Sequence, residues 1–162
     1  MRRLHARFTL ALLAGAILLL FSASRVLSAD GYIAVVVHPG VHVNTLTFAE
    51  VRKLLFGDRQ YWTADLRVTL VMRAPVARER EIVLKTIYQM TEAQFRQYWI
   101  SKVFRAEAAS GPRIVYSNDE ATGLVGAIPG SISFMDVTQV PKGLKVLRVD
   151  GHLPGEPGYR LH

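Results

Sequence analysis

The 162-residue sequence contains no cysteine. This excludes a disulfide framework, a thiolate metal site, a cysteine nucleophile and a lipid anchor on an N-terminal cysteine. The sequence also has little excess positive charge after residue 29. Four of the 20 basic residues lie in residues 1–29, which hold no acidic residue, so 16 basic residues face all 13 acidic residues from residue 30 onward. That small excess does not indicate a nucleic-acid-binding protein.

Long apolar runs are absent except for one near the N-terminus. Residues 8–21 form it, after a segment, residues 2–7, that holds three arginines and no acid. Its 14 residues are fewer than the roughly 20 that span a bilayer. We therefore interpret residues 1–29 as a signal peptide cleaved between about Ser24 and Ala29, and expect a periplasmic or secreted protein. An uncleaved N-terminal anchor is the alternative.

Residues 30–162 are predicted to form one domain, because no linker or repeat interrupts them. β-Branched runs alternate with segments of helical periodicity, which favours an α/β fold, a three-layer sandwich on a mostly parallel sheet. Strands are predicted at 32–37, 67–72, 114–116, 131–135 and 144–149. Helices are predicted between 47 and 57, over 77–90, from 91 to about 104, and from 117 to 129. Three of these helices begin with a capping box, at Thr47, Thr91 and Ser117.

Aromatic residues are expected to form core rather than a binding surface. Phe95, Trp99 and Val103 follow one another at intervals of four residues, so they are predicted to share the buried stripe of one helix. Trp62 is expected to join them in the core, and Tyr98 to be partly exposed.

The order of motifs resembles that of the solute-binding proteins of phosphate ABC importers, and is most similar to short, phosphate-binding-protein-like domains. The resemblance covers residues 32–161. It rests on LTFAEVRKLLFGDRQYW, a strand ending in Arg73, EAQFRQYWISKVF and IPGSISFMDV. It implies a type 2 periplasmic binding-protein fold, reduced to a single lobe.

The resemblance also implies a function. In phosphate binders the arginine is followed by Ser-Gly-Thr, whose positions here fall on Ala77, Arg78 and Glu79, so only Arg73 carries over. We expect an exported solute-binding-like domain that binds phosphate or another small oxyanion weakly and serves ABC-type transport or sensing. Tight binding would need a second wall, from an oligomer or a membrane transporter. The alternative is an envelope interaction module that has lost its ligand and docks on an envelope protein.

The residues themselves point to the same loop. A strand end runs into a helix N-terminus there, where unpaired N–H groups and arginines favour an anion. The candidate oxyanion site comprises Arg73, Ala74, Val76, Ala77 and Arg78. The competing interpretation is a solvated face, in which adjacent glutamates balance the arginines after Ala77.

Other candidate chemistry is weaker. His38, His42 and Thr45 could lie on a ligand face, but Pro39 makes the intervening segment a turn, so the two histidines are not predicted to bind a metal. The sequence shows no motif that pairs a nucleophile with a general base, and no pair of carboxylates placed to face each other. We therefore expect a non-enzyme without a cofactor.

Overall fold

The structure, a computed structural model, describes residues 31–162. The predicted signal peptide lies outside the described residues. Within the described part of the chain, no helix is both long and apolar enough to cross a membrane. The strands are β1 (Ile33–Val37), β2 (Thr45–Leu46), β3 (Tyr61–Thr63), β4 (Leu66–Arg67), β5 (Thr69–Arg73), β6 (Arg113–Val115), β7 (Ser131–Asp136), β8 (Lys145–Val146) and β9 (Arg148–Val149). The helices are α2 (Phe48–Leu55), α3 (Arg78–Val83), the π-helical η1 (Leu84–Tyr88), α4 (Glu92–Phe104), α5 (Asn118–Ala127) and the 3₁₀ turn η2 (Val137–Gln139).

The central sheet has the strand order β6-β5-β7-β1-β8. β5 is parallel to both β6 and β7, whereas β1 is antiparallel to both β7 and β8. Four of the five strands therefore run in one direction, which confirms the predicted mostly parallel sheet. The reversed strand, β1, lies inside the sheet.

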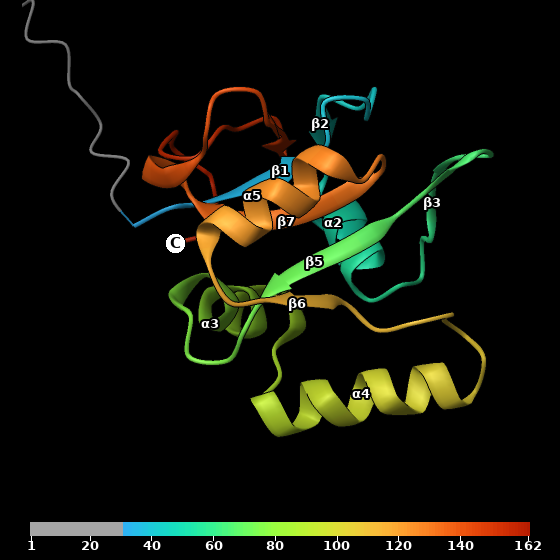
Figure 1. Cartoon of the computed structure of the whole chain (residues 1–162). Helices are drawn as coiled ribbons and strands as arrows, with labels where there is room; N and C mark the ends of the chain where they lie inside the picture. Colours follow the sequence, from blue (N-terminus) through green and yellow to red (C-terminus); the bar gives the residue numbers. More distant parts are fainter. Residues whose placement is uncertain (1–30) are drawn as a thin grey trace, which may run out of the picture.

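Helices cover both faces of this sheet, and Figure 1 shows α5 crossing it on one side. Alternate residues of β1 point into two separate cores. Ala34 and Val36 pack with α5, whereas Ile33, Val35 and Val37 join the larger core with α2, η1 and α4. The period of two along a strand thus produces the three layers expected from the sequence.

The predicted capping boxes mark the helix starts. Both reciprocal hydrogen bonds form at Thr47 and at Thr91. At the third, Ser117 accepts the backbone N–H of Glu120, but the carboxylate of Glu120 accepts the N–H of Tyr116 instead of that of Ser117. All three signals are local, and all three helices begin where the sequence places them.

Three predicted elements differ from those observed. The helix expected over 77–90 widens after Val83 into the π-helical η1, and Gln89 ends it with a φ of 55°. The strand expected over 67–72 is interrupted at Val68, between β4 and β5. The strand expected over 144–149 is divided between β8, which pairs with β1, and β9, which pairs with β2.

Along α4, the predicted buried stripe is correct at Phe95 and Trp99 and wrong at Val103, which is 39% exposed. The buried position is Lys102. At 3.6 residues per turn, residue 103 is rotated about 80° away from residue 95, whereas residue 102 is rotated by about 20°. Residue 103, two steps of four after residue 95, therefore lies off the buried face. Residue 102, reached by a step of four and a step of three, stays on it. Trp62 is buried and Tyr98 half-buried, as predicted.

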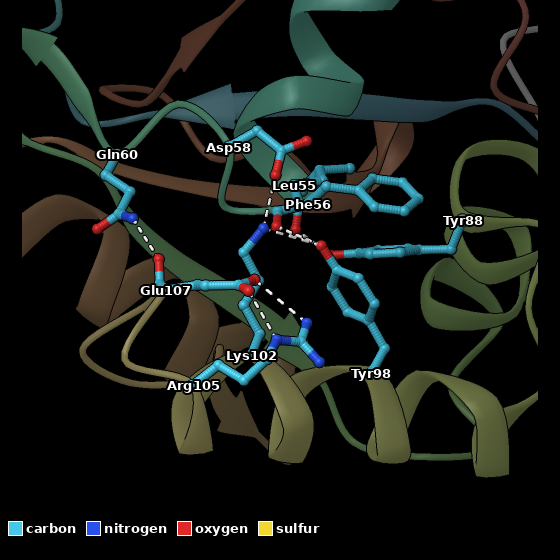
Figure 2. Close-up of polar contacts among 9 residues, drawn as sticks. All are labelled: Leu55, Phe56, Asp58, Gln60, Tyr88, Tyr98, Lys102, Arg105 and Glu107. Atoms are coloured by element: carbon cyan, nitrogen blue, oxygen red, sulfur yellow. Dashed lines mark hydrogen bonds and ion pairs between the residues drawn. The ribbon is translucent and has the colours of Figure 1, made fainter.

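Side chains from η1 and α4 form hydrogen bonds to the backbone carbonyls at the C-terminal end of α2 (Figure 2). The Tyr88 hydroxyl donates to the carbonyl of Leu55 at 2.5 Å, and the Tyr98 hydroxyl donates to that of Phe56 at 2.7 Å. The last carbonyls of a helix have no partner inside it, so these hydroxyls satisfy acceptors that would otherwise be buried unbonded. Burial raises the pKa of Tyr88, which keeps its hydroxyl a donor.

Candidate functional site

The predicted anion site lies at one edge of the central sheet, which we call the Arg73 edge. Arg73 ends β5, and the next residue, Ala74, donates its N–H to the carbonyl of Val115 at the end of β6 at 2.8 Å. Asp136 ends β7 at the same edge. The loop over residues 74–77 then leads into α3. Carboxyl ends of parallel strands are where ligands bind in open α/β sheets.

The guanidinium of Arg73 already has a carboxylate beside it. Its Nη1 lies 3.4 Å from Oε1 of Glu79, and both side chains are largely buried, with 16% and 11% of their surfaces exposed. Nε of Arg73 is buried and has no hydrogen-bond partner among the described residues. The cavity that these two side chains share with Arg80 is too narrow to admit water. Glu79 therefore stands where an anion would meet Arg73.

Arg80 is a buried structural residue. Its Nε and Nη2 donate to the two carboxylate oxygens of Glu92 at 2.5 and 2.9 Å, and its Nη1 donates to the carbonyl of Arg73 at 2.9 Å. Its guanidinium carbon lies 4.8 Å from the ring centre of Phe95. These hydrogen bonds lower the pKa of Glu92. The interpretation of a wholly solvated face is therefore wrong, because Arg80 and Glu79 are both buried.

Arg78 ties the start of β1 to the end of β7. Its Nη1 lies 3.1 Å from Asp136, and its Nη2 donates to the carbonyl of Gly31 at 2.5 Å. Burial alone would raise the pKa of Asp136, but hydrogen bonds from the hydroxyl and amide of Thr138, and the charge of Arg78, lower it. Arg78 therefore has a structural partner as well as an exposed position.

The backbone of the loop offers fewer donors than the sequence suggests. Of the three amides expected to face an anion, that of Ala74 is bonded to β6, and that of Ala77 donates to the carbonyl of Ala74 at 3.3 Å. Val76 is fully exposed and has a φ of 69°, a region that a β-branched residue rarely adopts. The turn is thus tight, and two of its amides are occupied.

The structure does not bring His38, His42 and Thr45 together with Arg73. His38 follows the carboxyl end of β1, and because β1 is antiparallel to β7, this end meets Ser131 at the opposite edge of the sheet. The Nδ1 of His38 accepts the N–H of Gly40 at 2.9 Å. His42 and Thr45 are exposed. Within residues 31–162, no cluster of three histidine or acidic side chains could hold a metal ion.

Sequence reasoning missed a cavity of about 190 Å³ at that opposite edge. It lies where β5 and β6 begin, and its walls include the three arginines Arg59, Arg67 and Arg113. A signal was present in the sequence, because Arg67 begins one predicted strand and Arg113 directly precedes another. The three arginines are far apart along the chain, and only the fold brings them to the wall of one cavity.

Comparison with known proteins identifies the fold. No protein-family model matches the chain, and no curated protein sequence matches it significantly. Among solved structures, it is similar to one described as a phosphate ABC transporter substrate-binding protein with bound phosphate from Clostridium perfringens, with a TM-score of 0.61 and 16% identity over 76% of this chain and 46% of that one.

Two further structures are similar over 76% of this chain. They are an ABC-type phosphate transport receptor from Vibrio cholerae, with a TM-score of 0.61, 18% identity and 48% of its chain covered, and PstS from Borrelia burgdorferi, with 0.58, 18% and 49%. The chain therefore has the fold of phosphate ABC transporter substrate-binding proteins, as its motifs predicted. It spans about half the length of the structures it matches.

Proposed function

We propose that this chain is an exported solute-binding lobe that binds a small oxyanion such as phosphate weakly at the Arg73 edge, in the service of ABC-type transport or sensing. The observation that carries the proposal is the state of Arg73. Arg73 is the last residue of β5, at the carboxyl ends of the parallel strands. Its Nε has no partner within the described chain, and its Nη1 has one long contact of 3.4 Å, with Glu79. The likeness to structures described as phosphate-binding supports the choice of ligand.

Weak binding follows from Glu79. An incoming phosphate must displace this carboxylate from Arg73 and then remain close to it, and both steps oppose binding. A single lobe also leaves the anion partly hydrated, so each charge-assisted contact contributes less than in a closed site. We expect a Kd in roughly the high-micromolar to millimolar range, about 4–6 kcal/mol on the 1 M scale.

The same carboxylate favours a second candidate function. If Glu79 neutralises Arg73 permanently, the chain is a ligand-free module that docks on an envelope partner. Glu79 then acts as a built-in replacement for the anion, and phosphate has no site at this edge.

A charge-neutral substitution separates these functions. In calorimetry with inorganic phosphate, Glu79→Gln should bind at least about tenfold more tightly than the unmodified chain, because the repulsion is removed while the shape is kept. Adding Arg73→Ala should abolish that binding. The matched control is Glu81→Gln, which removes an exposed charge from the same helix without touching Arg73 and should change the affinity less than about twofold. If Glu79→Gln binds no phosphate, the ligand-free function is the correct one.

Export is tested separately. N-terminal sequencing of the protein from an envelope fraction should begin shortly after the predicted cleavage region, between Arg25 and Asp30. Recovery of the uncleaved chain in the membrane would favour the anchor.

A further inference from the structure

The cavity at the start of β5 and β6 is separate from the Arg73 edge. Thr69 begins β5 on the cavity wall, and Arg73 ends the same strand, so the two edges lie roughly 13 Å apart at about 3.3 Å per residue. The volume of about 190 Å³ has room for on the order of ten water molecules. A small multi-atom ligand therefore fits without displacing any element of the fold.

The charge on the cavity wall is of one sign. Arg59, Arg67 and Arg113 line it, and none of its lining residues is acidic. Arg67 and Arg113 are exposed and form no ion pair with any residue of the described chain. Guanidinium groups gathered without carboxylates repel one another, and a bound anion relieves that repulsion.

Two acidic residues next in sequence to residues of the cavity wall are each paired with another cation, as Figure 2 shows. Glu107 lies 2.6 Å from Arg105, and Asp58 lies 2.5 Å from the ammonium group of Lys102. Neither carboxylate lines the cavity. Asp58 and Glu107 therefore form no ion pair with the arginines of the wall.

Parts of the wall are held in place before any ligand arrives. Arg59 donates to the carbonyls of Tyr61 and Trp62 at 3.2 and 3.3 Å, and its guanidinium carbon lies 5.8 Å from the Trp62 ring centre. The side-chain amide of Gln60 donates to the carbonyl of Glu107 at 2.7 Å, which fixes the neighbouring loop (Figure 2). Fixed donors lose less conformational entropy on binding than mobile ones.

We propose that this cavity binds a small anion carrying two or more negative charges on phosphate or carboxylate groups. Arg67 and Arg113 supply planar donor pairs that match such groups, and Arg59 adds a fixed charge. Thr69 and Ser110 also line the same space. A singly charged ligand would leave most of this charge uncompensated. The site does not depend on the proposed function of the Arg73 edge.

The test uses calorimetry of the full chain with inorganic pyrophosphate and with citrate, which represent the phosphate and carboxylate groups. At least one should bind saturably, with a Kd below about 1 mM. Arg67→Gln and Arg113→Gln should each weaken that binding about tenfold or more, and both side chains are exposed, so the variants should fold. The matched control is Arg96→Gln on α4, which removes an exposed arginine away from the cavity and should change the affinity less than about twofold.

Two results would overturn the proposal. One is the absence of saturable binding for both anions. The other is an equal loss in the Arg96 variant, which would mean that only overall charge matters. The Glu79→Gln variant keeps the two sites distinguishable, because it should tighten phosphate binding at the Arg73 edge and leave the pyrophosphate or citrate affinity of the cavity unchanged.

Discussion

Gly130→Ala should destabilise the protein far more than the same change at another glycine of positive φ. Gly130 precedes β7 with a φ of 78°, and a Cβ built on it would lie 2.1 Å from the backbone carbonyl oxygen of Arg67. Its own carbonyl accepts the Thr69 N–H at 3.1 Å and the Trp62 indole N–H at 2.8 Å. The glycine of the Pro-Gly motif is thus required by a close approach of two backbones.

The loss of stability expected for Gly130→Ala follows from these contacts. A left-handed conformation costs an alanine about 1–2 kcal/mol. Relieving a 2.1 Å contact requires β4 to move, which weakens both hydrogen bonds to the Gly130 carbonyl, each contributing about 1 kcal/mol and more when the buried indole donor of Trp62 is left unbonded. The total is about 4 kcal/mol, a large fraction of the 5–15 kcal/mol that typically stabilises a domain.

Urea unfolding followed by tryptophan fluorescence measures this loss. Gly143→Ala is the matched control, because Gly143 has a φ of 107° and no atom lies within 4 Å of its added Cβ. The control should lose only the conformational part, about 1–2 kcal/mol. If the Gly130 and Gly143 variants unfold within about 1 kcal/mol of each other, the close backbone approach is not what holds this turn.

Three further predictions concern stability. The pKa of Glu92 is lowered, so its hydrogen bonds with Arg80 stabilise the fold fully above about pH 4.5 and progressively less as the pH falls through the folded-state pKa. Glu92→Gln should therefore cost about 1 kcal/mol at pH 7 in urea unfolding, and this cost should shrink steadily as the pH is lowered below 4.5. Asp58→Ala leaves the ammonium of Lys102 without its carboxylate and should lower the free energy of unfolding in urea by about 1–2 kcal/mol. Lys102→Met removes the charge itself, so it should change that free energy by less than about 1 kcal/mol. Equal losses in the two variants would contradict this asymmetry. Gly123→Ala, inside α5 with no atom within 4 Å of the new Cβ, should stabilise by about 0.5–1 kcal/mol in thermal unfolding.

The parts of the fold that sequence predicts are those with local causes. A capping box is complete within four residues, so the helix starts at Thr47 and Thr91 follow from the sequence alone. The reversed direction of β1 has no local cause, because it depends on pairing with β7 about a hundred residues later. The burial of Lys102 was missed for another reason: its charge argues for exposure, and only the carboxylate of Asp58 and the hydroxyl of Tyr98 make its position tolerable.

For the candidate site too, the sequence predicts the local structure but not the contacts that depend on the fold. The loop after Arg73 is correctly predicted as a strand end entering a helix, because the apolar run and the change of period are visible in the sequence. The side chain that faces Arg73 is not predictable from that pattern. On a helix, Glu79 could equally point to solvent, and only the fold shows it buried against the guanidinium. The sequence therefore predicts the loop after Arg73 but not the carboxylate that lies beside its guanidinium.

The two edges of the sheet differ in how their charges are compensated, and this decides where an anion meets the protein first. At the Arg73 edge, each of the three arginines lies beside its own carboxylate, at 3.4, 3.1 and 2.5 Å. At the start of β5 and β6, three arginines share one cavity with no acidic residue in its wall. Since the potential of a cleft depends on the sum of its charges, the second edge attracts anions without any rearrangement, whereas the first must release Glu79. The Arg73 edge, which holds the carboxyl ends of the parallel strands, is thus the more costly one for an anion to occupy in this chain.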